Sequence, residues 1–250
     1  MSEFILFPLI FAASFVLTMV GLGGGLIFAP LFILLQFPVS EAVSASLFLN
    51  GIAALSAAIN YFRKRMVDLQ IGLPLIVSSA LFAPLGAYTT SMIDLRVFTA
   101  TLAAVILLAA GRMFFSKKVE SGQQTVGTPR KIIGGGLIGM LIGFAGGMLG
   151  IGGGVFIVPL LIYILKVPTK IAAATSIFIV VFSSFSGFLA HITIAAPDWK
   201  FILLAAVFSF AGGQLGSQFM IAKLQGGTIR KIFACVLLIF AFKLIQRIFA

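Results

Sequence analysis

The sequence predicts an all-α polytopic membrane protein built from two inverted repeats, and three observations support this fold class. Of the 250 residues, 61% are hydrophobic and only 9% are charged, which is more apolar surface than a soluble domain can bury. Residues 4–40 and 132–165 contain no charge and exceed the roughly 20 residues that cross a bilayer core. A glycine-rich word occurs twice, and a broken apolar segment in each of two repeats is typical of transporters.

The internal repeat begins with Gly-Leu-Gly-Gly-Gly at residues 21–25 and Gly-Ile-Gly-Gly-Gly at residues 150–154. Each word is followed at the same distance by a proline, Pro30 or Pro159. Beyond the words the correspondence continues through Pro38 with Pro168, Ser46 with Ser176, Ser56 with Ser186, and Asp68 with Asp198. We therefore expect a first transmembrane repeat at residues 1–115, a polar cytoplasmic linker at 116–130 and a second transmembrane repeat at 131–250.

Each half contains five apolar segments, which together predict about 8–10 membrane segments. They are residues 4–20, 26–35, 42–62, 71–90 and 97–115, then 132–149, 155–165, 171–192, 201–222 and 229–248. The second segment of each half, about ten residues or ~15 Å of helix, covers half of the ~30 Å hydrocarbon core.

These short segments are expected to be half-helices that start at the glycines near mid-membrane. They should end before Pro38 and Pro168, because the residue before a proline disfavours helix. The three segments after each half-helix are long enough to span the membrane fully. Two tilted full spans that meet at a glycine turn remain an alternative in each half.

The basic residues predict that the two repeats have opposite orientations. Arg63, Lys64 and Arg65 follow the third segment of the first half, but the matching loop at 191–200 has no basic cluster. In the second half, other loops carry the charge, at Lys166, Lys170, Lys223, Arg230 and Lys231. Lys and Arg gather in cytoplasmic loops. Because the basic loops of one half correspond to loops without a basic cluster in the other, the pattern predicts inverted topology with both termini outside. Lys243 and Arg247 near the C-terminus oppose it.

Several classes of function are excluded by composition and motif. The net charge of +11 resides mostly between apolar segments, so it indicates topology rather than a nucleic-acid partner. One cysteine, one histidine and six scattered carboxylates offer no local metal site, and the single Cys235 cannot form an internal disulfide. Leu26 and Val155 occupy the position where a dinucleotide fingerprint needs glycine. His191 lies at a segment end, so we expect no catalytic residue, no cofactor and no enzyme activity.

The glycine words predict an anion site between the repeats. Glycines that interrupt a helix leave backbone N–H groups free, and the half-helices point their positive dipole ends toward the protein centre. No Lys or Arg lies near the middle of a segment, so backbone dipoles would have to attract the anion. Close helix packing by small residues is the alternative role of these glycines.

Polar residues within the apolar segments complete the predicted site. Asn50 and Gln214 are the most informative, because a buried amide has several hydrogen bonds to satisfy. The predicted substrate-binding residues are Gly23, Gly24, Gly25, Gly152, Gly153, Gly154, Ser46, Asn50, Ser176 and Gln214.

The paired Gly-x-Gly-Gly-Gly words, each with a proline five residues after its last glycine, resemble the TauE/SafE family of sulfite exporters and 4-toluene sulfonate uptake permeases. The resemblance extends over nearly the whole chain, and only the glycine words carry over residue by residue. It implies a multi-pass transporter of the inner (plasma) membrane for small organosulfur or related anions such as sulfite, sulfoacetate, taurine or thiosulfate. The alternatives are a passive anion channel, favoured by the lack of a carboxylate deep in a segment, and a membrane role other than transport.

Overall fold

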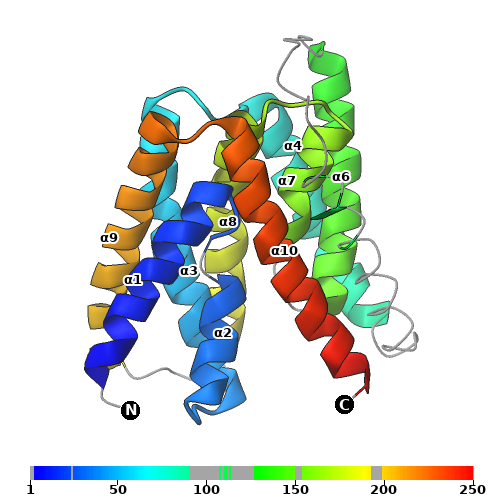
Figure 1. Ribbon diagram of the computed structural model, residues 1–250. Helices are drawn as coiled ribbons and strands as arrows, with labels where there is room; N and C mark the ends of the chain where they lie inside the picture. The colour runs from blue at the N-terminus through cyan, green and yellow to red at the C-terminus, as the bar shows by residue number, and fades with distance from the viewer. Residues whose placement is uncertain are drawn as a thin grey trace.

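The computed structural model describes residues 3–23, 25–89, 107, 110–111, 113, 127–149, 154–192 and 199–249, and within them it contains helices and no strand (Figure 1). The helices of the first half are α1 Glu3–Val20, α2 Gly25–Leu34, α3 Val39–Arg63 and α4 Leu69–Thr89. Those of the second half are α6 Thr128–Leu149, α7 Gly154–Tyr163, α8 Thr169–Ile192, α9 Trp199–Lys223 and α10 Gly226–Phe249. The all-α prediction is confirmed, whereas the predicted segment 97–115 lies almost entirely outside the described residues.

Three of the described helices are long and apolar enough to cross a membrane. These spans are Glu41–Arg63, Thr169–Leu189 and Trp199–Lys223, within α3, α8 and α9. Large apolar side chains also lie on the outside of the bundle, where Leu81 and Leu189 are each 66% exposed. Such exposed apolar surface suits contact with lipid rather than water.

The two short helices have the predicted length, and both end before a proline. Both α2 and α7 contain 10 residues. Each is followed by a residue with positive φ, Gln36 at 67° or Lys166 at 52°. The chain then passes Pro38 or Pro168 and enters α3 or α8 at the next residue. The helices thus begin at the last glycine of each word, next to the predicted start, and end before the proline, but one or two residues earlier than predicted and ahead of a left-handed residue.

Helices α3 and α8 form the centre of the bundle and pack against each other. Helix α1 packs on α9, α4 packs on α6, α2 on α3 and α7 on α8. If each helix of the first half is exchanged for its counterpart in the second half, the α3–α8 contact maps onto itself, α1–α9 is exchanged with α4–α6, and α2–α3 is exchanged with α7–α8.

Glycines permit the close approach of the paired helices α4 and α6. A Cβ at Gly135 would lie 2.7 Å from the carbonyl oxygen of Ile71, and one at Gly139 would lie 2.5 Å from that of Leu75. Glycine also allows α9 to approach α1, because a Cβ at Gly212 would lie 2.5 Å from the oxygen of Phe11. Backbone contact through small residues is typical of helix pairs in membranes.

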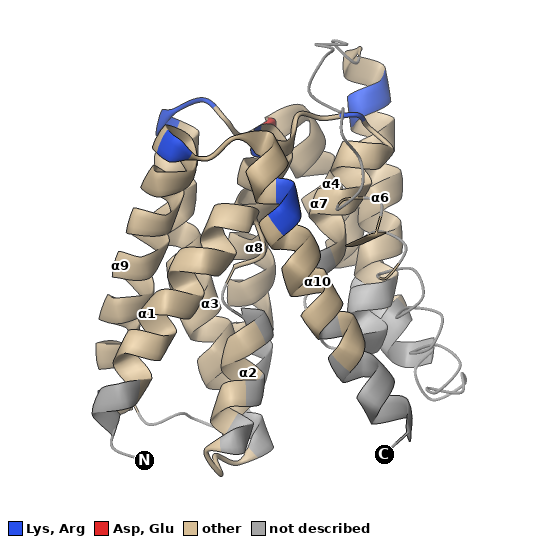
Figure 2. Ribbon diagram, in the orientation of Figure 1, with Lys and Arg blue, Asp and Glu red and all other residues tan. Residues whose placement is uncertain are grey.

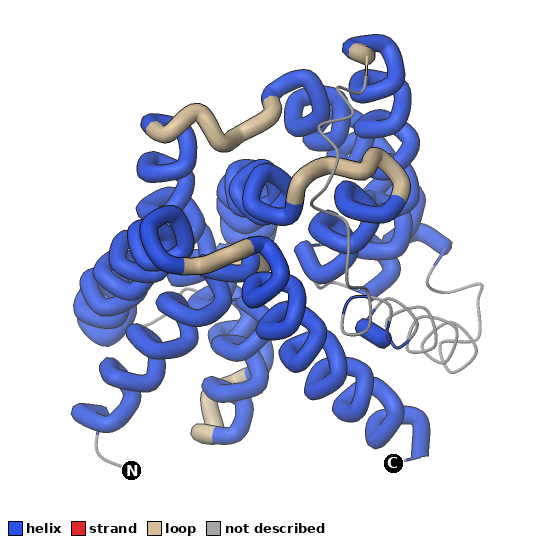
Figure 3. The backbone as a smooth tube through the Cα atoms, turned by 45° about the horizontal axis from the view of Figure 1, so that its top comes forward, coloured by secondary structure: helices blue, strands red, loops and turns tan. Residues whose placement is uncertain are grey.

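Corresponding helices run in opposite directions along the bundle. In Figure 1, α1 and α3 run away from the end that carries the N and C labels, whereas α6 and α8 run toward it. Helices α2 and α4 run toward that end, whereas their counterparts α7 and α9 run away from it. The loops α3–α4, α7–α8 and α9–α10 therefore lie together at the other end, which Figure 3 turns forward.

We call this second end the basic end, because most described Lys and Arg residues gather there (Figure 2). They are Arg63, Lys64, Arg65, Arg130, Lys131, Lys166, Lys170, Lys223, Arg230 and Lys231. The exceptions are Lys200, in the first turn of α9, and Lys243 and Arg247, in the last turns of α10, which lie toward the opposite end. Loops of both halves thus lie together at the basic end, as expected from their sequences.

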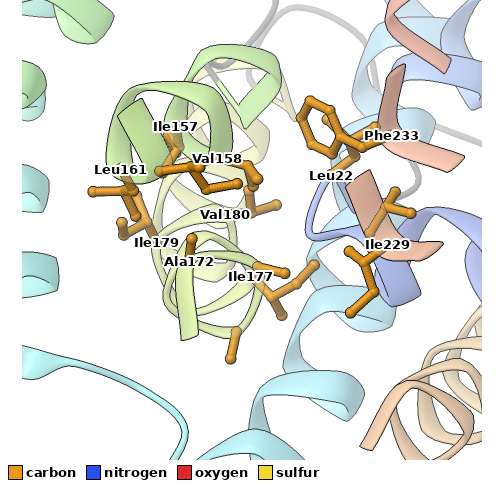
Figure 4. Packing of buried hydrophobic residues seen from close by; sticks show 14 of the residues in the cluster. Leu22, Ile157, Val158, Leu161, Ala172, Ile177, Ile179, Val180, Ile229 and Phe233 are labelled. Carbon is orange, nitrogen blue, oxygen red and sulfur yellow. The ribbon is translucent and has the colours of Figure 1, made fainter. Parts of the chain in front are cut away.

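The larger hydrophobic cluster encloses the end of the first glycine word. Leu22 is 4% exposed and belongs to the same cluster as Val180 of α8 and Phe233 of α10. Figure 4 shows Leu22 beside Phe233 and Ile229, facing the side chains of α7 and α8. Residues 21–23, which follow α1, are therefore in the interior of the protein.

Candidate functional site

The first glycine word ends α1 with a tight turn. The N–H of Leu22 donates to the carbonyl oxygen of Leu17 at 3.0 Å, and Gly21 between them has φ of 92°. This bond pattern with a left-handed glycine is the Schellman arrangement that often ends helices. Gly23 also has positive φ, at 68°, so both positions use a conformation that glycine adopts without strain.

Helix α8 holds this turn from one side. The hydroxyl of Ser176 donates to the carbonyl oxygen of Gly21 at 2.6 Å, and the bond is buried. A Cβ at Gly21 would lie 2.7 Å from Cα of Ala173 and 2.9 Å from its carbonyl oxygen. Ser176, a predicted site residue, therefore contacts the glycine word directly, and Gly21 allows α8 to come this close.

Asn50 approaches the same turn from α3. Its Nδ2 donates to the hydroxyl oxygen of Ser184 at 2.7 Å, and the side chain is 8% exposed. Its Oδ1 is buried and has no hydrogen-bond partner among the described residues. A Cβ at Gly23 would collide with this oxygen. We refer to Gly23, Asn50 and Ser184 as the Gly23–Asn50 cluster.

The unpartnered oxygen of Asn50 makes this cluster a candidate binding site. A buried acceptor without a hydrogen bond costs about 1–3 kcal/mol, which a bound ligand with a donor group would recover. A half-turn of the amide exchanges its two ends. It would then aim the Nδ2 donors at Gly23 while Oδ1 accepts from Ser184, so one side chain can present either a donor or an acceptor.

Gln214 has a different environment from Asn50, although both were predicted as site residues. Its Nε2 donates to Oδ1 of Asn60 at 3.2 Å, and its Oε1 accepts from the hydroxyl of Ser56 at 3.1 Å. Asn60 in turn donates to Ser217 at 2.8 Å. Both ends of the Gln214 amide are thus engaged between α3 and α9, so here it holds two helices together. A contribution of Gln214 to binding remains a prediction.

The other predicted site residues are only partly described. Ser46 is buried on α3, at 3% exposure, and Gly25 and Gly154 are the first residues of α2 and α7. Gly24, Gly152 and Gly153 lie outside the described residues. The contacts of the second glycine word therefore stay a prediction.

Two inward-facing residues were missed by the sequence analysis. The hydroxyl of Tyr61 donates to the carbonyl oxygen of Thr18 at 2.9 Å, so it helps to close the end of α1. Arg230 was counted as a loop charge, but it lies within α10 and is only 4% exposed. The sequence carried no clear signal for this burial, because α10 also has apolar residues on its exposed face, such as Ile239 and Phe242.

Comparison with known proteins gives the family. The model of the sulfite exporter TauE/SafE family matches residues 6–244. The chain is 28% identical to the probable membrane transporter protein YunE of Bacillus subtilis, over 98% of both chains. It is 29% identical to the probable membrane transporter protein ORF9 of a Sinorhizobium species, over 87% of this chain and 83% of that one. No solved structure matches. The family is one of membrane transporters, and this chain belongs to the sulfite exporter TauE/SafE family.

Proposed function

We propose that this protein is a secondary transporter of small organosulfur or related anions, such as sulfite, sulfonates and thiosulfate, in the plasma membrane. We further propose that the anion binds beside the glycine words, between the two halves. The Gly23–Asn50 cluster carries this proposal, because it places a buried amide next to the non-helical backbone of Gly23, and a half-turn of that amide would aim its Nδ2 donors at an anion. Membership of the TauE/SafE family supports the class of substrate.

The electrostatics around Gly23 favour an anion. Helix α2 begins at Gly25, and the first N–H groups of a helix lack intrahelical partners and carry partial positive charge. The end of α1 would oppose this with its carbonyl groups, but several of these are covered. The carbonyl oxygen of Leu17 accepts from the N–H of Leu22. That of Thr18 accepts from the hydroxyl of Tyr61, and that of Gly21 accepts from the hydroxyl of Ser176. These hydrogen bonds reduce the extent to which the carbonyl groups of α1 compensate the positive end of α2.

We infer that the two halves are inverted repeats that alternate access to this site. The opposite directions of corresponding helices and the contacts that map onto each other when the halves are exchanged support this inference. In transporters of this kind the halves rock around a fixed site near mid-membrane.

A passive anion channel is the second candidate. The described carboxylates are Glu3 and Glu41, toward one end of the bundle, and Asp68 at the basic end. Within the described part of the chain, no carboxylate is therefore placed inside the bundle to carry a coupling proton.

Flux into proteoliposomes tests the proposal and separates the two candidates. Radiolabelled sulfite, taurine and thiosulfate would be offered to vesicles with and without the same anion inside. A transporter should show saturable uptake that rises when unlabelled substrate is inside. Uptake that follows the electrochemical gradient without this counterflow would favour a channel, and no flux of any of the three compounds would contradict both readings.

A further inference from the structure

Arg230 is a buried cation, and among the described residues no hydrogen bond reaches two of its nitrogens. It belongs to the inward face of α10, together with Gly226, Phe233, Leu237 and Ala241, whereas its neighbour Lys231 is exposed. The side chain is 4% exposed. Two of its guanidinium nitrogens, Nε and Nη1, are buried and make no hydrogen bond.

The described residues contain no carboxylate that compensates this charge. Glu3 and Glu41 lie toward the opposite end of the bundle, and Asp68 is paired with Lys131 at 2.6 Å. Helices α1 and α8 pack against α10, and their described ionisable side chains at the basic end amount to Lys170, another cation. A guanidinium does not lose its proton in proteins, so neutralisation cannot relieve the several kcal/mol that an unpaired buried ion costs.

Arg230 shares a helix face with a residue that lies beside the first glycine word. Phe233 lies one turn further along the same face of α10, and its side chain is beside Leu22, the residue before Gly23 (Figure 4). Because α10 runs from the basic end toward the other end, Arg230 lies on the basic side of this contact. An anion that entered from the basic end would meet Arg230 before it reached the glycines.

We propose that Arg230 binds a small oxyanion on the basic side of the glycine word and so forms a second anion subsite of the transporter. This inference rests on the proposed function and adds a fixed charge to a site that the sequence assigned to backbone dipoles alone. The guanidinium presents several donors in a planar fork, which suits the oxygens of sulfite or a sulfonate. Its 4% exposure favours a small free anion over the headgroup of a lipid.

Thermal unfolding of the purified protein in sodium sulfite and in sodium gluconate of equal ionic strength tests this subsite. Wild-type protein should be stabilised by sulfite, and Arg230→Met should need at least about tenfold more sulfite for the same shift, since charge-assisted bonds are lost. In gluconate, Arg230→Met should melt no lower than wild type, because the variant removes an unpaired buried charge. Lys231→Met is the matched control, which removes an exposed charge from the same turn and should respond like wild type.

Each other outcome has a distinct meaning. An undiminished sulfite response in Arg230→Met overturns the subsite but leaves the proposed function, whereas a wild-type protein that responds to neither sulfite, taurine nor thiosulfate contradicts the proposed function itself. If Arg230→Met does not fold, Arg230→Lys replaces it and should respond more weakly than wild type, because lysine lacks the planar fork; an equal response overturns the proposal. Stabilisation by phosphatidylglycerol micelles that depends on Arg230, without a sulfite response, would show a lipid site instead.

Discussion

Gly21 and Gly23 share a positive φ, but a side chain would meet different atoms at the two positions. A methyl group at Gly21 would press on the backbone of Ala173, which cannot move without α8. A methyl group at Gly23 would press on the amide of Asn50, which can rotate, and would lie 2.9 Å from Cγ1 of Val180. The first glycine is therefore required for packing, whereas the second borders the candidate site.

This difference predicts separate effects of two alanine variants. In each variant the free energy of unfolding should fall by about 1–2 kcal/mol, because alanine is strained in the left-handed conformation. The fall should be larger for Gly21→Ala, because its new methyl group collides with backbone atoms. Gly23→Ala should fold better than Gly21→Ala but lose substrate affinity, since Asn50 is displaced. Melting temperature and sulfite binding, measured on the same purified samples, decide this. Wild-type affinity in folded Gly23→Ala would remove Gly23 from the site.

Asn50 can be tested against its own hydrogen-bond partner. Asn50→Leu removes the unpartnered oxygen together with the bond to Ser184, so stability should change by less than about 1.5 kcal/mol, the net worth of an ordinary hydrogen bond. Substrate affinity should fall at least about tenfold, which corresponds to 1.4 kcal/mol. Ser184→Ala removes the same bond but keeps the amide, and should retain most of the affinity. Equal binding by Asn50→Leu and wild type would assign the amide to structure.

The sequence identified Gly23, Asn50 and Ser176, which the structure brings to one turn, because glycine and amide groups are conspicuous in apolar segments. It missed the Asn60–Gln214 pair and the burial of Arg230. Both depend on which helix faces which, and a sequence that is apolar on all sides of most helices does not reveal that.

At the level of helices, boundaries were more predictable than packing partners. Glycine and proline mark the starts and ends of α2 and α7, and both have the expected length. The pairing of α1 with α9 and of α4 with α6 joins segments from different halves. It depends on matching surfaces that local sequence patterns do not encode.

Two glycines three residues apart in α6 allow a matched test of the α4–α6 contact. A Cβ at Gly139 would lie 2.9 Å from Cα of Leu75, whereas one at Gly136 would meet nothing within 4 Å. Gly139→Ala should therefore lower the melting temperature despite the helix propensity of alanine, which favours it over glycine by about 1 kcal/mol. Gly136→Ala should be neutral or slightly stabilising. Equal melting temperatures for the two variants would show that α4 and α6 are not in close backbone contact.

For the whole molecule, the inverted-repeat proposal relates the basic end to the candidate site. The α2–α3 turn and the α7–α8 turn occupy corresponding positions of the two halves but lie at opposite ends of the bundle. The short helices α2 and α7 thus run from the interior toward opposite ends of the bundle. That arrangement suits a site reached alternately from both sides.

Gln36 and Lys166 allow a direct test of this inversion, because they occupy equivalent positions in the two repeats. Both are exposed, and both have a left-handed backbone conformation. The exposed Cys235 would first be replaced by serine, and single cysteines introduced as Gln36→Cys and Lys166→Cys. An impermeant maleimide applied to intact cells should label Gln36→Cys, whereas Lys166→Cys should react only after the membrane is opened, since basic loops stay in the cytoplasm. Arg65→Cys, at the basic end of the first half, should behave like Lys166→Cys. Labelling of Gln36→Cys and Lys166→Cys from the same side would contradict the inverted arrangement, whatever the substrate proves to be.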